Sequence, residues 1–443
     1  MPSLLLATAS TSQQDNSKII DMCKARTLLI LAVISILMGT ISCAEKDVYD
    51  PERHQAIIRY VSPVDSVDQE HTWQLTENHT YSVSIDANVE ATRLEIYSEN
   101  PVESTEAELM SRVFVSYGQT VTLTVSMPVL LTTLYAALVD ADGKYTVTSF
   151  SKTSRSVSFS SPIATKQSPR LATPKIMAYS YCYEEDFPEP GDYDFNDIVM
   201  RIGLERTGQK TMDIHVTLSA VGASRPITVA LRLVGYRYQD IDSIKAKDGK
   251  TLNKNVPTTC MEIIKNDEIL QTGRNGEAVV NLFLDAHWAI GDDLPETNGD
   301  FPRYKYNVKK TYSDGYEQTY AKNVTFTVYF KSESNLNNIT LDMLDPFIMT
   351  YYTGGVVETH TDEFAAAQTM YEYNALSIKD VPWALRIPTR YFKYPLEGVE
   401  IGFKKKGIML GAYMTNGHSF GEWCEDHRNY LDWYQYPEDR QVF

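Results

Sequence analysis

The sequence predicts an all-β protein of two domains, an N-terminal immunoglobulin-like β-sandwich followed by a larger β-sandwich or jelly-roll-like domain. Two observations lead to this fold class. Short segments in which apolar and polar residues alternate recur along most of the chain, with turn-forming residues between them. Only two segments, at 361–373 and 419–427, have a helical pattern.

The first 43 residues have the order of a secretory signal and are not expected to belong to the fold. Lys24 and Arg26 precede the apolar run LLILAVISILM, and the small-residue stretch GTISC ends it. The segment resembles a bacterial lipoprotein signal, in which the closing cysteine, here Cys43, is lipidated after cleavage. An ordinary secretory signal or a membrane anchor, with Cys43 unmodified, is the alternative. Because a polar stretch precedes Lys24, Met22 is a candidate for the true start.

Residues 44–54, which begin AEKDVYDP after Cys43, are polar and charged and are predicted to form a tether. They resemble the export signal of surface lipoproteins of the Bacteroidetes. This resemblance implies an outer-membrane lipoprotein that is held by its lipid anchor and faces outward.

The charge balance is acidic, with 58 Asp and Glu against 41 Lys and Arg and a net charge of −17. It argues against a nucleic-acid partner, since phosphates require a basic face. After Cys43 the chain contains Cys182, Cys260 and Cys424, so at most one disulfide can form, and the sequence does not show whether any pair does. No CxxC pair suggests zinc.

Residues 55–160 are predicted to form the immunoglobulin-like sandwich. Alternating strand patterns occur at 80–86, 92–98 and 121–127, and 131–150 contains two strands around an Asp-Gly turn. A change in composition to Ser, Thr, Pro and Lys then marks a linker, which we place at 161–177.

Residues 178–443 are predicted to form the second β domain. The strand patterns are IVMRIGLE, MDIHVTLSAVG, ITVALRLVG, VVNLFLDA, VTFTVYF and GVEIGF. No internal repeat indicates a solenoid or a propeller.

The stretch YEEDFPEPGDYDFNDIVM, residues 183–200, contains seven carboxylates and no Lys or Arg. If its second half is extended, the ligand oxygens alternate with Tyr193 and Phe195, which would anchor the stretch in the core. Oxygen donors at this density suit Ca²⁺ better than Mg²⁺ or Zn²⁺. The predicted ligands of a structural Ca²⁺ are Glu185, Asp186, Asp192, Asp194, Asn196 and Asp197.

Two alternatives bear on this site. It is not an EF-hand, because counting from Asp192 puts Asp197 at the sixth position instead of Gly and Gly203 at the twelfth instead of Glu. A solvated acidic turn, with Asp and Asn as turn formers, is the alternative to a metal site.

The acidic stretch and the segment DIHVTLSAVGAS that follows it resemble the LruC-type domain of bacterial surface lipoproteins. The shared features are an aromatic-Glu-Asp stretch, a Pro/Gly turn, the motif GDYDFND and a later Gly-Ala-Ser ending. They fall on Tyr183, Glu185, Asp186, Gly191 to Asp197, Gly222, Ala223 and Ser224. The segments DPFIM, VPWALRIP, FKYPLEGVEI and LDWY extend the similarity to 178–443. The resemblance implies a β-rich domain with a calcium-type acidic site, and it implies no enzymatic activity.

Other residues in the sequence are also functional candidates. Glu358 and Asp362 flank His360 and are the best local candidates for a glycosidase pair, but a polar strand end explains them equally well. His215 is expected to face solvent. The segment 284–304 carries Asp285, Asp292, Asp293 and Asp300, which suit either a second ion or an exposed loop.

Aromatic residues near the C-terminus suit either sugar stacking or a core. They are Trp383, Tyr391, Phe392, Tyr394, Trp423, Trp433 and Tyr434. The short basic run Lys404–Lys406 is expected to be a solvated turn.

The sequence therefore predicts a calcium-stabilised, outward-facing lipoprotein that binds a glycan, a host protein or an envelope component and is not an enzyme. A polysaccharide-acting hydrolase and a purely structural envelope protein are the alternatives.

Overall fold

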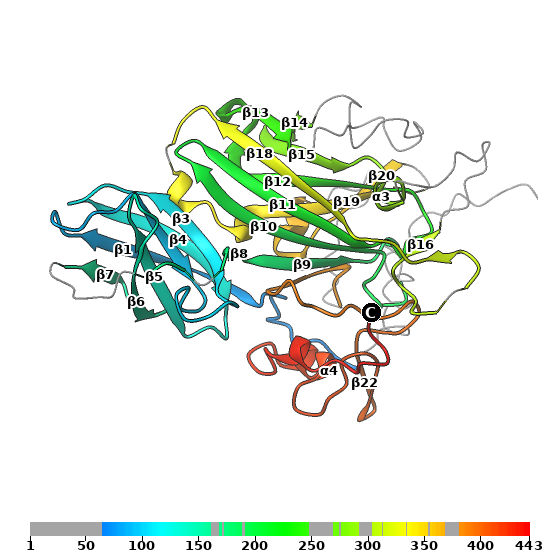
Figure 1. The fold of residues 1–443 in the computed structure, drawn as a ribbon. Coiled ribbons are helices and arrows are strands. Elements are labelled where there is room, and N and C mark those ends of the chain that lie inside the picture. The colour runs from blue at the N-terminus through cyan, green and yellow to red at the C-terminus, as the bar shows by residue number, and fades with distance from the viewer. Residues whose placement is uncertain are drawn as a thin grey trace, which may run out of the picture. The chain divides into compact units, whose positions relative to one another are not determined.

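The computed structural model describes residues 64–160, 168–170, 172–187, 191–247, 269–273, 276–291, 304–311, 313–333, 335–352, 355–367 and 381–443. All of them belong to one compact unit, 55–443. The predicted signal segment, Cys43 and the tether lie outside the described residues. The predicted all-β fold class is confirmed (Figure 1). No helix among the described residues is long and apolar enough to span a bilayer.

The first sandwich packs a three-stranded sheet against a five-stranded sheet. The smaller sheet has the order β4 (Thr120–Pro128), β1 (Thr76–Ile85), β7 (Ser156–Phe159). The larger has the order β6 (Tyr145–Ser151), β5 (Thr133–Val139), β2 (Arg93–Tyr97), β3 (Glu108–Phe114), β8 (Lys175–Ile176). The alternating residues predicted above, such as Val83, Leu94 and Leu123, are fully buried between the sheets. Strand β8 lies inside the predicted linker 161–177.

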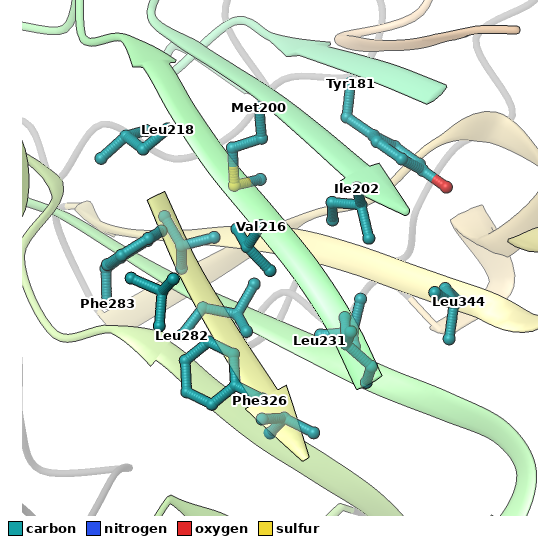
Figure 2. Close-up of a cluster of buried hydrophobic side chains, with 14 of the residues drawn as sticks. Tyr181, Met200, Ile202, Val216, Leu218, Leu231, Leu282, Phe283, Phe326 and Leu344 are labelled. Atoms are coloured by element: carbon teal, nitrogen blue, oxygen red, sulfur yellow. The ribbon is translucent and has the colours of Figure 1, made fainter. Parts of the chain in front are cut away.

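The second domain also packs two sheets face to face. One has the order β13 (Ile241–Ala246), β18 (Lys322–Phe330), β11 (Thr211–Ala220), β10 (Ile198–Gly208), β9 (Ala178–Tyr183), β21 (Ala384–Ile387). The other has the order β14 (Leu270–Thr272), β15 (Glu277–Phe283), β12 (Ile227–Arg237), β19 (Leu344–Tyr352), β20 (Gly355–Thr359). Figure 2 shows side chains of both sheets, among them Met200, Val216, Leu231 and Leu282, pointing into one buried cluster.

The remaining elements are short. The small sheets are β16 (Lys305–Tyr306) with β17 (Tyr316–Glu317) and β22 (Phe403–Lys405) with β23 (Ile408–Leu410). The α-helices are α3 (Ala286–Ile290) and α4 (Phe420–Glu425). The 3-10 helices are η1 (Tyr238–Asp240), η3 (Leu336–Asn338), η4 (Leu341–Met343), η5 (Asp362–Ala367) and η6 (Trp433–Gln435).

Residues 388–443, called the C-terminal lobe below, are folded around aromatic rings instead of a regular sheet. Trp433 is fully buried, with its ring centroid 5.0 Å from that of Tyr413 and 5.6 Å from that of Trp423. Trp73, from the segment that precedes β1, packs edge-on to Trp423 at 5.4 Å. The lobe therefore has its own core, to which the start of the described chain contributes.

Three local predictions need correction or completion. The helical pattern at 361–373 forms only the 3-10 helix η5, and 368–373 lie outside the described residues. The pattern at 419–427 forms α4, with Ser419 as its N-cap in a capping box. The predicted strand GVEIGF is wrong except for Phe403. The Ile401 amide bonds to the Tyr193 carbonyl, and the carbonyls of Glu400 and Ile401 accept from the amides of Ala412 and Tyr413, which makes no named strand.

Candidate metal centre

The acidic loop, residues 184–197, connects the antiparallel strands β9 and β10. Its predicted extended conformation is wrong, because Tyr193 and Phe195 have φ values of 56° and 52°. Bulky residues adopt this left-handed conformation only where their surroundings hold it. Both rings are buried in the core of the C-terminal lobe, and the Tyr193 carbonyl accepts a 2.7 Å hydrogen bond from the Ile401 amide. The anchoring role predicted for the rings therefore agrees with the structure.

The kinked backbone places several acidic side chains inside the protein. Glu184, Asp194 and Asp197 are buried, and Asn196 is fully buried, whereas Asp192 is exposed. A solvated acidic turn would leave all these carboxylates in water. That alternative does not describe this loop.

Glu184, Asp192 and Asp194 form a carboxylate cluster, with one oxygen of each lying within 4.8 Å of the others. The sequence prediction included the two aspartates and missed Glu184, choosing its neighbours Glu185 and Asp186 instead. Glu184 is the first residue after β9, where the alternation of a strand no longer applies. The sequence pattern therefore did not show that its side chain is buried.

The Glu184 carboxylate is only half satisfied. Its Oε1 accepts a hydrogen bond from the Phe195 amide at 2.5 Å, and its Oε2 has no hydrogen-bond partner among the described residues. The Gly191 backbone lies close to this oxygen, since a Cβ on Gly191 would lie 2.1 Å from Oε2. An unpartnered buried carboxylate oxygen is costly unless a proton or a cation neutralises it.

Asp194 is held in place by two backbone amides. Its Oδ1 accepts from Asn196 at 3.1 Å, and its Oδ2 accepts from Gly398 of the C-terminal lobe at 2.8 Å. These contacts fix the carboxylate beside Glu184, but amide dipoles do not supply the full positive charge that a cation would supply.

The pKa values show the resulting imbalance. Burial, followed by repulsion from Asp197, Asp194 and Asp192, raises the pKa of Glu184 well above its usual value. Burial and the charge of Asp192 raise the pKa of Asp194 to about 8. Burial and the charge of Glu185 raise the pKa of Asp197 strongly. In the protein alone, burial and mutual repulsion therefore disfavour the charged forms of these carboxyls.

The other predicted ligands are engaged elsewhere. Both Glu185 oxygens accept backbone amides, from Ser224 at 2.9 Å and Arg225 at 3.0 Å. Asp186 forms a 3.2 Å ion pair with Arg225. The Asp197 carboxylate accepts the Glu185 amide at 2.7 Å. These residues brace the loop and do not join the three-carboxylate cluster.

Asn196 braces the loop through its amide group. Its Nδ2 donates to the Pro395 carbonyl at 3.3 Å, and its Oδ1 has no hydrogen-bond partner among the described residues. The Asn196 side chain is packed so tightly against Gly222 that a Cβ there would lie 2.0 Å from Oδ1.

Three segments distant in sequence hold the loop. The Gly222 amide donates to the carbonyls of Asn196 and Asp197, and the Glu184 amide donates to the Trp383 carbonyl. Pro395 and Gly398 supply the contacts described above. These residues fall in the Gly-Ala-Ser, VPWALRIP and FKYPLEGVEI segments. In the sequence these segments share one family resemblance with the acidic stretch, and that association was the signal that they contact the loop.

The cluster fits a hard cation. Carboxylates are oxygen donors of the kind that Ca²⁺ prefers, and none of the sulfur or imidazole ligands typical of zinc belongs to the cluster. Glu184, Asp192 and Asp194 would supply ligands, and the exposure of Asp192 leaves the cluster accessible from solvent.

Of the candidate glycosidase residues, His360 and Glu358 belong to a buried ionic cluster. His360 Nδ1 lies 2.9 Å from Asp345, and its ring stacks on Phe347 at 4.6 Å. Burial lowers the pKa of His360, but the contacts with Asp345 and then Glu358 outweigh it, so the pKa is raised. Arg232 also pairs with Asp345 at 2.9 Å. The cluster thus pairs its charges internally, and Asp362 lies outside these contacts.

A second acidic group, Glu205, Asp213 and His215, also has ligand atoms within 4.8 Å. Here the charges are paired, since Arg112 contacts Glu205 and Lys247 contacts Asp213. His215 is half-buried and bonds to Thr325 Oγ1 at 3.2 Å. Basic partners make a cation unnecessary.

Asp285 serves as the N-cap of α3, accepting from the amides of His287 and Trp288. Asp292, Asp293 and Asp300 lie outside the described residues, so the suggested second ion stays a prediction. Lys404 pairs with Glu425, and Lys406 occupies the turn between β22 and β23 with φ of 52°.

Most of the aromatic candidates for sugar stacking are core residues. Phe392, Tyr394, Trp423, Trp433 and Tyr434 are buried. Trp383 is half-buried and packs against Phe187, and Tyr391 is 59% exposed. Cys182 and Cys424 are buried and free of disulfides, and Cys260 lies outside the described residues.

The fold and the loop define an all-β protein of two sandwiches, with a buried carboxylate cluster beside a C-terminal aromatic lobe. The chain belongs to the family described as "Domain of unknown function (DUF4842)", whose model matches residues 210–434. The match begins after the acidic loop and includes the segments around Gly222 and Gly398 that hold it. The resemblance to LruC-type domains stays a prediction.

Among solved structures, the chain is similar to a "Putative lipoprotein from Bacteroides ovatus". The two share 16% sequence identity, with 80% of this chain and 99% of that chain covered and a TM-score of 0.48. No curated protein matches the chain.

Proposed function

We propose that this protein is an LruC-type lipoprotein, tethered through Cys43 to the outer membrane and facing outward, whose second domain is stabilised by Ca²⁺ at the acidic loop. Its role is binding, with the loops and the C-terminal lobe presented to a glycan, a host protein or an envelope component.

One observation carries the calcium proposal. Glu184 is buried and has an unpartnered oxygen close to the carboxylates of Asp192 and Asp194, and the nearby Arg225 forms an ion pair with Asp186. A bound divalent cation would offset the repulsion and satisfy the free oxygen. Its binding energy would add to the stability of the folded state alone.

The C-terminal lobe explains why such a cation would affect more than one loop. The Asp194 carboxylate accepts a hydrogen bond from the Gly398 amide, and the rings of Tyr193 and Phe195 are buried in the aromatic core of the lobe. Loss of the cation would therefore loosen the contact between the loop and the lobe as well as the loop itself.

Support for export comes from the sequence. A basic pair, an apolar run and a cysteine follow one another near the N-terminus, and the chain carries a net charge of −17. We favour binding over catalysis because His360 is buried against Asp345 and Phe347, Asp345 also pairs with Arg232, and Asp362 takes no part in these contacts.

The proposal is tested by melting the chain from residue 44 onward, which retains the compact unit 55–443. With Ca²⁺ at about 100 times its dissociation constant, stabilisation of about 2.7 kcal/mol over the chelator-treated protein is expected. For domains of this size, that corresponds to a rise in Tm of roughly 5–11 °C. Mg²⁺ should give a smaller rise, and equal Tm values in Ca²⁺ and chelator contradict the proposal.

Two variants locate the site. Asp194→Asn removes a ligand charge and should abolish the calcium-dependent rise while the protein still folds. Asp142→Asn is the matched control, because it removes an exposed carboxylate from an Asp-Gly turn that Asn-Gly also supports. A rise that persists in Asp194→Asn would place the ion elsewhere.

A further inference from the structure

The C-terminal lobe carries an open groove of about 630 Å³ on its surface. It is lined by the loop after β21, which contains Tyr391, by Thr415, and by the chain that continues from η6 through Tyr436. Its volume lies in the range of sites for small organic ligands. The groove is separate from the acidic loop's cluster, since it shares no lining residue with it.

Two tyrosine rings are presented at the groove. Tyr391 is 59% exposed and Tyr436 is 39% exposed. A third ring, Tyr434, is largely buried and forms part of the groove wall. Exposed rings at a concave surface offer flat apolar faces to a ligand.

The exposed rings are braced from behind. His418 stacks on Tyr436 with a centroid distance of 4.1 Å, and His418 is itself held by Asp432 at 2.8 Å. The Tyr391 hydroxyl accepts a hydrogen bond from Lys175 Nζ at 3.2 Å. Rings already held in place lose little conformational entropy when a ligand stacks on them.

The wall of the groove rests on a rigid base. Tyr434 and Gln435 belong to η6, next to the fully buried Trp433. Thr389 follows β21 closely, and its carbonyl accepts a 2.7 Å hydrogen bond from Ser180 on β9. The groove is therefore attached both to the aromatic core of the lobe and to the sheet of the second domain.

The polar groups at the groove are neutral or paired. Thr389, Thr415 and Gln435 offer hydroxyl and amide groups, which both donate and accept hydrogen bonds. Lys393 and Asp439 are the charged residues in the lining, and they pair with each other at 2.7 Å. The lining thus carries no net charge, which disfavours an ionic ligand.

We propose that this groove binds a neutral glycan. Sugar rings have apolar C–H faces that stack on aromatic rings, and they have hydroxyls that exchange hydrogen bonds with threonine and glutamine. The lining at Tyr391 and Tyr436 offers both kinds of contact in one place. This inference assigns a ligand class to the binding role proposed above and rests on it.

Affinity electrophoresis in native gels tests the proposal. The chain from residue 44 onward is run in gels containing the neutral polysaccharides galactomannan, xyloglucan or laminarin, and in gels containing the acidic polysaccharide polygalacturonate. Retardation by at least one neutral polymer, without retardation by the acidic one, is expected. Absence of retardation by all the neutral polymers overturns the proposal, as does retardation by polygalacturonate alone.

Variants assign the binding to the groove. Tyr391→Ala and Tyr436→Ala should each weaken the apparent affinity about two- to tenfold, and the double variant should abolish retardation. Tyr117→Ala and Tyr320→Ala are matched controls, since these tyrosines are 68% and 96% exposed and lie outside the groove. If the double variant binds like the parent chain, the groove is not the site.

Running every gel in Ca²⁺ and in chelator separates this inference from the calcium proposal. Failure of glycan binding, with a calcium-dependent Tm rise intact, overturns the groove alone. Glycan binding by a protein whose Tm does not respond to Ca²⁺ supports the groove and overturns only the calcium proposal.

Discussion

Glu95 in the first sandwich and Glu184 in the acidic loop are both buried carboxylates, but Glu95 lies among basic side chains and Glu184 lies among acidic ones. Glu95 accepts hydrogen bonds from Arg112 Nε at 2.7 Å and Arg93 Nε at 2.9 Å, and from the hydroxyl of Tyr97 at 2.6 Å. Burial raises its pKa, but the charge of Arg112 and the Tyr97 bond outweigh burial, so the pKa of Glu95 is lowered. Glu184 has three carboxylates near it, and its pKa is raised.

The cations that pair with Glu95 come from its own sheet. Arg112 lies directly opposite Glu95 in the pairing of β3 with β2, and Arg93 is two residues away on the same face of β2. The sheet thus brings its own cations to Glu95. The acidic loop has Arg225 nearby, which pairs with Asp186, and the cluster around Glu184 is left to a proton or an external ion.

The largest effect is expected when the partner of Glu95 is removed. Arg112→Met leaves a buried carboxylate with only Arg93 as a cation and also removes the contact to Glu205. Breaking a buried ion pair from one side costs about 3–5 kcal/mol. Thermal and urea denaturation should show this loss equally in Ca²⁺ and in chelator, because the first sandwich does not contain the proposed site.

Lys144→Met is the control for this variant. Lys144 pairs with Asp142 at 3.7 Å on the surface of the same sandwich, where both side chains are about half exposed or more. Exposed pairs contribute about 0–1 kcal/mol. If Arg112→Met loses no more stability than Lys144→Met, the contrast between the two buried glutamates does not hold.

An intermediate effect is expected from pH, because protons and a cation compete for the loop. In chelator, the folded-state pKa of Asp194 is about 8 against 3.8 for an ordinary aspartate. Because the pKa of Asp194 is raised in the folded state, its protonation stabilises that state. This stabilisation is fully present below pH of about 4 and is lost as the pH rises through about 8. The metal-free protein should therefore lose stability across this window.

The calcium-dependent rise in Tm should follow the opposite course. It should be near zero at pH 5, where Asp194 is protonated, and should approach its full value, about 2.7 kcal/mol at saturating Ca²⁺, above pH 8. Melts in matched buffers with and without chelator measure it. A calcium effect that is independent of pH between 5 and 8 would mean that these carboxyls are not its ligands.

Much of the fold could be predicted from the sequence, because strands that are buried on one face alternate in polarity. The segments around Val83, Leu94 and Val216 show this alternation and form strands as predicted. Strand β3, with the sequence ELMSRVF, alternates less clearly, since Arg112 serves Glu95 on its polar face, and it was missed. The C-terminal lobe was not predicted, because packing of rings distant in sequence has no period.

The site was predicted in part for a related reason. The density of carboxylates located the loop, and Asp192 and Asp194 do lie together. The left-handed φ values at Tyr193 and Phe195 are imposed by the lobe, so an extended chain was the wrong expectation. Glu185 is hydrogen-bonded and Glu184 is left with a free oxygen because the backbone amides of Ser224 and Arg225, some 40 residues away, donate to Glu185. This difference cannot be read from the local sequence.

The smallest effect is expected from the difference between Glu184, with its unpartnered oxygen, and the hydrogen-bonded Glu185. Glu184→Gln keeps an acceptor for the Phe195 amide and removes a charge that is repelled by its neighbours, so in chelator at pH 8 it should raise stability. Glu185→Gln should lower stability by about 1–3 kcal/mol, because one of its two accepting oxygens becomes an NH₂ group that faces a backbone donor.

Two adjacent residues with the same substitution should thus change the chelator Tm in opposite directions, and only Glu184→Gln should remove a ligand of the proposed ion. Differential scanning calorimetry of the two variants and the parent chain measures both effects. Equal decreases in the two variants would show that Glu184 supports the folded loop as a hydrogen-bonding group, as Glu185 does, and that its unpartnered oxygen does not destabilise the metal-free protein.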